Sequence, residues 1–278
     1  MTTIPLNFNR IDNTIYRLNR YPLQHEGLPF SVGKVSDLSG YVTYMDEIEL
    51  LNNLKEIYRN MAHAAMRAGR EPSEVTLISV TKTVDIDLIR KAVDIGLREF
   101  GENRVQEAQR KVKSDALRLM SERIHWHLIG HLQKNKVKIA VELFDLIQSV
   151  DSFELAEIIS KQAESVNKTQ RILLQVKLAD EESKYGMSID DLSSLIERIS
   201  SLNSLKVEGL MTIPPFFEDA EKVRPYFREL STLRDGLEKS GFKLPELSMG
   251  MSGDFEVAIE EGATMVRVGT AIFGKRSN

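Results

Sequence analysis

The 278-residue sequence contains no cysteine. This absence excludes disulfide bonds, thiolate metal sites and a cysteine nucleophile, and it fits a reducing compartment. No apolar run approaches the length that spans a membrane. The N-terminus also lacks the basic and then apolar pattern of a secretory signal. We therefore expect a cytoplasmic protein that does not enter a membrane.

An excess of positive charge is also missing. The chain has 37 Lys and Arg against 41 Asp and Glu, a net charge of −4, so nothing indicates a nucleic-acid partner. Hydrophobic residues make up 42% and charged residues 28%, as in an ordinary globular protein. The length is sufficient for one large α/β domain or two small ones.

The first 45 residues differ from the rest of the chain. They contain three prolines and show little periodicity, which predicts a loosely structured N-terminal extension over residues 1–45. Their arginines face few acids, as in an organelle transit peptide, but the segment is poor in serine. Residues 46–278 are expected to form a single domain.

From residue 46 onward, helical and strand-like segments alternate. Strands are predicted at 75–80, 97–100, 124–129, 146–150, 171–178, 205–211, 247–249 and 265–268. Helices are predicted at 47–68, 85–95, 104–119, 136–143, 152–167, 189–199, 219–239 and 255–260. Eight strands alternating with helices indicate a (β/α)₈ TIM barrel. An open doubly wound sheet is the alternative, but its G-x-G-x-x-G fingerprint is absent.

The helix at 47–68 precedes the first predicted strand, whereas almost no chain follows the last one. The outer ring of a barrel needs a helix beside each strand. We therefore expect this extra N-terminal helix to take the place of the missing eighth helix.

The first predicted strand is a β-branched, apolar run that ends at Lys82. A lysine at the carboxyl end of a barrel strand lies where functional residues gather. In a cleft there, loss of hydration favours the neutral amine, which is a nucleophile toward carbonyl groups. The sequence thus predicts that Lys82 forms a Schiff base, although a surface lysine at a strand exit would look the same.

The segments after the last two strands favour a phosphate site. Ser252 supplies a hydroxyl, Gly269 allows close approach to a backbone N–H, and Thr270 adds another donor. Arg267 lies two residues before Gly269. A phosphorylated aldehyde would satisfy these groups and Lys82 together, and pyridoxal 5′-phosphate (PLP) is the leading candidate. An arginine facing its ring nitrogen would leave the pyridine unprotonated, which disfavours transaminase chemistry.

Several long motifs in the same order resemble the pyridoxal phosphate homeostasis proteins (the YggS/PROSC family). They begin at Val80 (VTKT), Phe100 (FGENRVQE), His127 (HLIGHLQKNK), Gly209 (GLMTI), Leu247 (LSMGMSGD) and Val266 (VRVGTAIFG). The resemblance covers residues 46 to 274 and implies a barrel of the alanine racemase N-terminal-domain type.

The same resemblance implies a set of cofactor-binding residues: Lys82, Asn103, Met211, Ser252, Arg267, Gly269 and Thr270. In that assignment Lys82 bonds to the aldehyde and Arg267 faces the ring nitrogen. Asn103 and Met211 line the cofactor. No catalytic residue and no metal ligand are implied.

For function, the resemblance implies a protein that carries and buffers PLP and contributes to vitamin B6 and amino-acid balance, with apo PLP-dependent enzymes as candidate recipients. A racemase needs a second acid or base on the opposite face of the cofactor. Alanine racemases bring theirs from an additional domain in a dimer. Almost no chain follows the last predicted strand here, so we expect no such domain, and therefore a monomeric carrier rather than a racemase. A weak amino-acid racemase is the enzyme alternative, and a Schiff-base aldolase acting on a sugar phosphate is a third.

Two other polar groups have plainer explanations. His125, His127 and His131 have a spacing that permits a metal site, but no acidic ligand is clearly placed with them. The lysine-rich loop at 131–138 is either a second anion site or a solvated helix start, and we favour the latter.

Overall fold

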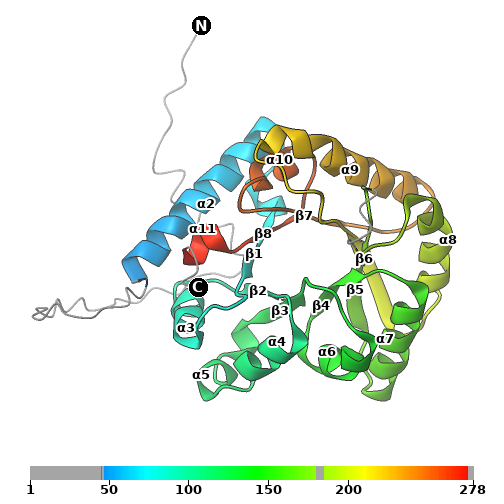
Figure 1. Cartoon of the computed structure of the whole chain (residues 1–278), viewed down its shortest axis with the longest axis horizontal. Coiled ribbons are helices and arrows are strands. Elements are labelled where there is room, and N and C mark those ends of the chain that lie inside the picture. Colours follow the sequence, from blue (N-terminus) through cyan, green and yellow to red (C-terminus); the bar gives the residue numbers. More distant parts are fainter. Residues whose placement is uncertain (1–44, 46, 180–184, 275–278) are drawn as a thin grey trace, which may run out of the picture.

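The computed structural model describes residues 45, 47–179 and 185–274. Within them, eight parallel strands form a closed barrel in the order β1 to β8 (Figure 1). The ring closes between β8 and β1, which pair from Thr76 opposite Met265 to Ser79 opposite Val268. The predicted (β/α)₈ barrel is confirmed, and the open doubly wound sheet is excluded.

The strands are β1 (Thr76–Val80), β2 (Glu99–Glu102), β3 (His125–Leu128), β4 (Leu146–Val150), β5 (Gln170–Gln175), β6 (Leu205–Met211), β7 (Glu246–Met251) and β8 (Met265–Val268). The α-helices are α2 (Glu47–Arg67), α3 (Ile86–Asp94), α4 (Val105–Val112), α5 (Asp115–Arg118), α6 (Val137–Leu143), α7 (Phe153–Ser165), α8 (Ile189–Ser200), α9 (Arg224–Lys239), α10 (Phe255–Glu260) and α11 (Thr270–Phe273). Short 3₁₀ turns are η1 (Pro72–Glu74), η2 (Ser121–Arg123), η3 (Lys134–Lys136) and η4 (Ala220–Val223).

The bounds of several predicted elements differ from the structure: the strand predicted at 171–178 ends at Gln175, and the helix predicted at 219–239 begins with the 3₁₀ turn η4. Two further differences lie between β2 and α5. The second strand lies at Glu99–Glu102 rather than 97–100. The helix predicted at 104–119 is divided into α4 and α5, because Ser114 has extended backbone and its Oγ accepts a hydrogen bond from the N–H of Leu117 at 3.4 Å. Such a bond is the signature of a new helix N-terminus.

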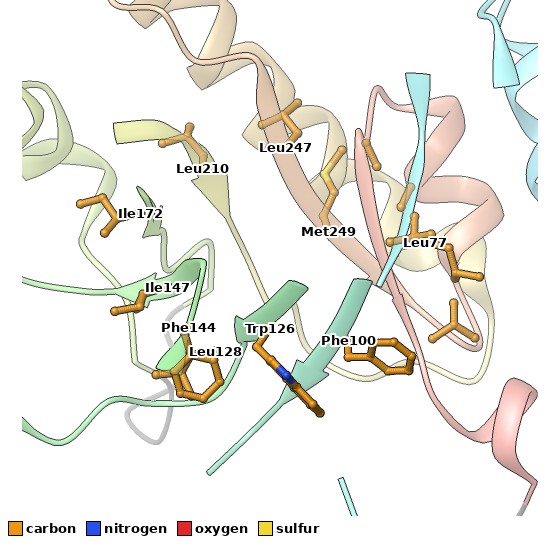
Figure 2. Packing of buried hydrophobic residues seen from close by; sticks show 14 of the residues in the cluster. Leu77, Phe100, Trp126, Leu128, Phe144, Ile147, Ile172, Leu210, Leu247 and Met249 are labelled. Atoms are coloured by element: carbon orange, nitrogen blue, oxygen red, sulfur yellow. The ribbon is translucent and has the colours of Figure 1, made fainter. Parts of the chain in front are cut away.

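Strand side chains alternate between two hydrophobic layers. The larger layer lies between the barrel and the helices, and Figure 2 shows part of it: Leu77, Phe100, Trp126, Leu128, Phe144, Ile147, Ile172, Leu210, Leu247 and Met249. A smaller cluster of Ile78, Leu146, Leu173, Met211 and Met265 belongs to the opposite strand face, which points into the barrel. Polar side chains occupy much of the remaining interior, and they become important at the site.

Helix α2 takes the place of the eighth outer helix, as predicted. It packs against α10 and α11 beside β8 and β1 (Figure 1), and it buries Leu50 and Leu54. Asn53 Nδ2 donates to the carbonyl of Ile272 at 3.0 Å, which ties α2 to the segment after the last strand. No helix in the described ranges is long and apolar enough to cross a membrane. The predicted extension over residues 1–45 lies outside the described residues, apart from Met45.

Candidate functional site

The carboxyl ends of β1, β2 and β8 place three of the predicted residues close together. The register of Val80 opposite Gly101 puts Lys82 and Asn103 at equivalent positions, each two residues further along adjacent strands. On the other side of β1, a Cβ atom at Gly269 would lie 3.2 Å from the Val80 carbonyl oxygen. One sector of the barrel mouth therefore holds Lys82, Asn103 and Gly269.

Three groups in and beside this sector form a hydrogen-bonded cluster suited to an oxyanion. Ser252 Oγ accepts hydrogen bonds from the N–H of Gly269 at 3.3 Å and from Thr270 Oγ1 at 3.4 Å. Because Ser252 receives both bonds, its own hydroxyl hydrogen is left to donate to a ligand. A Cβ atom at Gly269 would press against Val80, so glycine suits this close approach of β1 and the segment after β8.

The turn after β7 fixes Ser252. Gly250 has a φ of +89°, and a Cβ atom there would lie 2.5 Å from that of Ala258, so only glycine fits. Asp254 Oδ1 accepts a hydrogen bond from the N–H of Met251 at 2.5 Å. Burial raises the pKa of the Asp254 carboxyl above its usual value, although the hydrogen bond from Met251 and the charge of Arg267 act in the opposite direction.

Arg267 lies deeper, inside the barrel. Its guanidinium donates from Nη1 to Ser248 Oγ at 2.7 Å and from Nη2 to the carbonyl of Thr212 at 2.8 Å. Burial lowers the pKa of Arg267 to about 10, so the side chain stays protonated at neutral pH. Within the described chain these bonds occupy two of its five N–H donors, and further donors remain for a ligand.

A continuous chain of hydrogen bonds leads from Arg267 across the barrel interior. Ser248 Oγ donates to Gln148 Oε1 at 2.6 Å, and Gln148 Nε2 donates to His127 Nδ1 at 3.0 Å. His127 Nε2 donates to Glu99 Oε2 at 2.7 Å, a tautomer assigned from the bonding pattern. Every donor points the same way, from the guanidinium to the carboxylate. We call these five side chains the interior relay.

The sequence of this chain matches those of known proteins. The family model "Alanine racemase, N-terminal domain" matches residues 52–277. A protein of Aquifex aeolicus is 46% identical over 224 residues, covering 80% of this chain and 96% of its own. A protein of Escherichia coli is 37% identical over 230 residues, covering 82% and 97%. Both are named pyridoxal phosphate homeostasis protein. The chain belongs to this family.

Solved structures agree with the assignment to the pyridoxal phosphate homeostasis proteins. PipY of Synechococcus elongatus, solved with PLP bound, is 38% identical, with a TM-score of 0.68 over 78% of this chain and all of that one. An alanine racemase of Clostridium difficile shares the fold, with a TM-score of 0.63 at 15% identity. This chain covers 58% of that racemase. The predicted family and barrel type are confirmed.

The seven predicted site residues lie at two different depths in the barrel. Lys82, Asn103, Ser252, Gly269 and Thr270 lie at the mouth, at or beyond the ends of β1, β2, β7 and β8. Arg267 and Met211 are buried in the barrel, with Met211 in the inner apolar cluster.

Sequence reasoning missed a buried polar cluster beside Lys82. Glu102, at the end of β2, is fully buried and contacts Thr81 and Lys111. The aldolase alternative calls for a carboxylate near the lysine, and none was recognised at a strand end. The four-residue spacing of Glu107 and Lys111 was the available signal, because it predicts an ion pair on one helix face.

The histidines do not gather around a metal position. Both ring nitrogens of His127 bond to Glu99 and Gln148. No group of three or more His, Cys, Asp or Glu that could hold a metal exists in the part of the chain that the structure describes. His131 instead stacks on Tyr185, with ring centres 3.7 Å apart, and its Nδ1 lies 3.3 Å from Asp151 Oδ2. In the lysine-rich loop, Lys134 pairs with Glu154.

Proposed function

We propose that this pyridoxal phosphate homeostasis protein binds PLP at the mouth of the barrel and carries the cofactor on Lys82. One observation carries the proposal. A lysine after β1, a glycine packed closely against Val80 after β8, and a buried arginine on β8 lie in one sector of a closed barrel.

The residues present fit each part of PLP. Ser252 offers its hydroxyl hydrogen to the phosphate, and the N–H of Gly269 and the hydroxyl of Thr270, which donate to Ser252 Oγ, lie beside it and can exchange that partner for a phosphate oxygen. Arg267 offers a fixed, positively charged donor for its ring nitrogen. When bound, PLP supplies an aldehyde that condenses with the amine of Lys82, forming a carbon–nitrogen double bond and releasing water.

The comparisons favour a carrier over an enzyme. The curated relatives that this chain covers almost completely are named for cofactor homeostasis, whereas it covers little more than half of an alanine racemase. Reversible bonding of one lysine to the aldehyde is sufficient for loading and release. Apo PLP-dependent enzymes as recipients, a monomeric state and a cytoplasmic location stay predictions.

A weak amino-acid racemase is the second candidate, and one array of side chains favours it. Tyr185 stacks on His131, which lies against Asp151 beyond the ends of β3 and β4. Tyrosine and histidine are both able to move protons at neutral pH when suitably placed. These groups therefore provide an acid and a base near the mouth.

A borohydride trap tests the main proposal. Purified protein is mixed with PLP, its visible spectrum is recorded, and the product is reduced and digested for mass spectrometry. We expect a yellow protein with the pyridoxyl mass on Lys82, and none on the Lys82→Ala variant. A colourless protein with unmodified Lys82 would reject cofactor binding and favour the aldolase alternative.

The same preparation separates carrier from racemase. Loaded protein is incubated with single enantiomers of several amino acids, and the product is resolved by chiral chromatography. A carrier is expected to interconvert them no faster than free PLP does. Faster turnover that is lost in Tyr185→Phe would establish the racemase instead.

A further inference from the structure

Lys82 lies between two threonines whose backbone is held from several sides. Thr81 is fully buried, and its N–H donates to the carbonyl of Gly101 at 3.0 Å. Its hydroxyl donates to Glu102 Oε1 at 2.6 Å. Its carbonyl accepts from the N–H of Val84 at 2.9 Å and from Lys111 Nζ at 2.6 Å. Every polar group of the residue before Lys82 is therefore bonded.

Lys111 is the centre of this arrangement. It reaches from α4 into the protein, and its ammonium group donates to the Thr81 carbonyl, to Glu102 Oε1 at 2.7 Å and to Glu107 Oε1 at 2.8 Å. Three acceptors match the three hydrogens of an ammonium group. Removing one partner of such a buried set leaves an uncompensated charge, so the set acts as a unit. We call Glu102, Glu107 and Lys111 the clamp.

The residue after Lys82 has an unusual backbone conformation. Thr83 has a φ of +63°, which is uncommon for a β-branched residue and stores strain. Its N–H donates to Glu107 Oε1 at 2.6 Å. Burial alone would raise the pKa of Glu107, but hydrogen bonds from Lys111 and Thr83 reverse the effect and leave it lowered. An ionised carboxylate thus holds the strained residue in place.

We infer that the clamp positions Lys82, fixing the backbone on both sides so that the amine reaches the aldehyde of a cofactor bound at Ser252 and Gly269. The inference rests on the proposed function and goes further, because it gives a role to the two acids of the FGENRVQE motif. Glu102, Glu107 and Lys111 are positioning residues, since they contact Thr81 and Thr83 on either side of Lys82.

Positioning and general stability make different predictions. A lysine and an aldehyde react efficiently only when both are held in the right place, whereas binding of a phosphate and a ring does not depend on the lysine backbone. Pyridoxine 5′-phosphate has an alcohol in place of the aldehyde and cannot bond to the amine. The ratio of the Kd of pyridoxine 5′-phosphate to that of PLP therefore measures how much the bond between Lys82 and the aldehyde contributes to binding.

Two mild variants loosen the clamp on different sides of Lys82. Thr81→Val replaces the hydroxyl donor by a methyl group and keeps the shape of the side chain. Thr81→Ser is its counterpart, because serine keeps the hydroxyl donor. Glu107→Gln removes the charge that holds Thr83. Glu122→Gln is the matched control, because Glu122 is exposed. For each variant, the Kd of PLP and of pyridoxine 5′-phosphate is measured by fluorescence or calorimetry, and folding is checked by circular dichroism.

We expect Thr81→Val and Glu107→Gln to weaken PLP binding by about tenfold or more, with the Kd of pyridoxine 5′-phosphate changed less than twofold. Thr81→Ser and Glu122→Gln should resemble the wild type. Equal weakening of both compounds, or no weakening of either, would show that the clamp only stabilises the fold. If Glu107→Gln does not fold, Thr81→Val decides the question alone. Wild-type protein that binds neither compound would reject the proposed function and the positioning role together.

Discussion

Gln148 accepts a hydrogen bond from Ser248 at 2.6 Å in the centre of the barrel. Through its amide nitrogen it also donates to His127, so a single side chain joins the two halves of the interior relay. Replacement by an apolar residue of similar size would leave the hydroxyl hydrogen of Ser248 and the Nδ1 atom of His127 buried without a partner. Unpaired buried groups of this kind cost about 1–3 kcal/mol each.

We therefore expect Gln148→Leu to lower the free energy of unfolding by about 2 kcal/mol or more and to weaken PLP binding, because Arg267 loses a fixed neighbour. Urea unfolding and a spectral titration with PLP measure the two effects. Gln106→Leu, at an exposed position on α4, is the control and should change neither quantity. A Gln148→Leu protein of wild-type stability would mean that the relay rearranges without loss.

The far end of the relay predicts a pH dependence. Burial acts to raise the pKa of Glu99, but the hydrogen bond from His127 and the charges of His127, His125 and Arg171 together outweigh it, so the pKa lies below its usual value. A carboxyl with a lowered folded-state pKa contributes stability above the unfolded-state value, near 4.5, and this contribution is lost as the pH falls through the folded value.

Glu99→Gln should accordingly destabilise the protein at pH 7, by about 1–2 kcal/mol, and the difference from wild type should shrink below pH 4.5. Urea unfolding of both proteins at several pH values checks this. A difference that is the same at pH 7 and at acidic pH would show that the charge of Glu99 is not what stabilises His127.

The contact at Gly269 predicts the effect of adding a single methyl group. In Gly269→Ala, the Cβ atom would lie 3.2 Å from the Val80 carbonyl oxygen and 3.3 Å from Val80 Cβ, so the segment after β8 must shift. Overpacking of this kind costs about 1–3 kcal/mol, and the shift moves a phosphate donor. We expect weaker binding of both PLP and inorganic phosphate.

Gly236→Ala is the matched control for this substitution. Gly236 lies within α9 with no atom near the added methyl group, and alanine in a helix interior is favoured over glycine by about 0.5–1 kcal/mol. This variant should be slightly more stable than wild type and bind PLP normally. Normal binding by Gly269→Ala as well would remove Gly269 from the phosphate site.

Helix α2 predicts a stability effect far from the ligand. Leu54, on the buried face of α2, is 5% exposed, whereas Leu51 on the same helix is 39% exposed. Leu54→Ala removes buried methyl groups and should cost about 2–5 kcal/mol. Leu51→Ala should cost much less. Thermal and urea unfolding compare the two variants, and equal effects would mean that α2 does not close the outer ring.

Much of the fold could be predicted, because it depends on patterns that are local in sequence. The eight strands and the use of the helix at 47–68 followed from hydrophobic periodicity and from the order of elements. The boundary between α4 and α5 did not, since a serine within a charged stretch becomes a helix cap only in its tertiary setting. The predicted second strand ended two residues before β2 does for a related reason. Glu102 is buried at the strand end only because Lys111 is present as its partner.

At the site, residues that follow strands were predictable and residues that pair across elements were not. Lys82 and Gly269 could be inferred because barrel strands bring their carboxyl ends together. The contact of Glu102 with Lys111 joins a strand end to the next helix, and Gln148 lies within a strand whose residues are all buried. Linear spacing does not reveal which buried polar groups are bonded to one another.

The packing of α2 beside β8 has a consequence for the order in which the site is assembled. Helix α2 and β1 are synthesised before their partners α10, β8 and α11, so the ring closes through contacts between distant parts of the chain. Contacts of this separation form late in folding because they require closure of a long loop. Lys82 and the Gly269 segment lie on the two sides of that closure. An incompletely folded chain would carry Lys82 without the Gly269 segment beside it, so under the proposed function tight cofactor binding would report that the ring has closed.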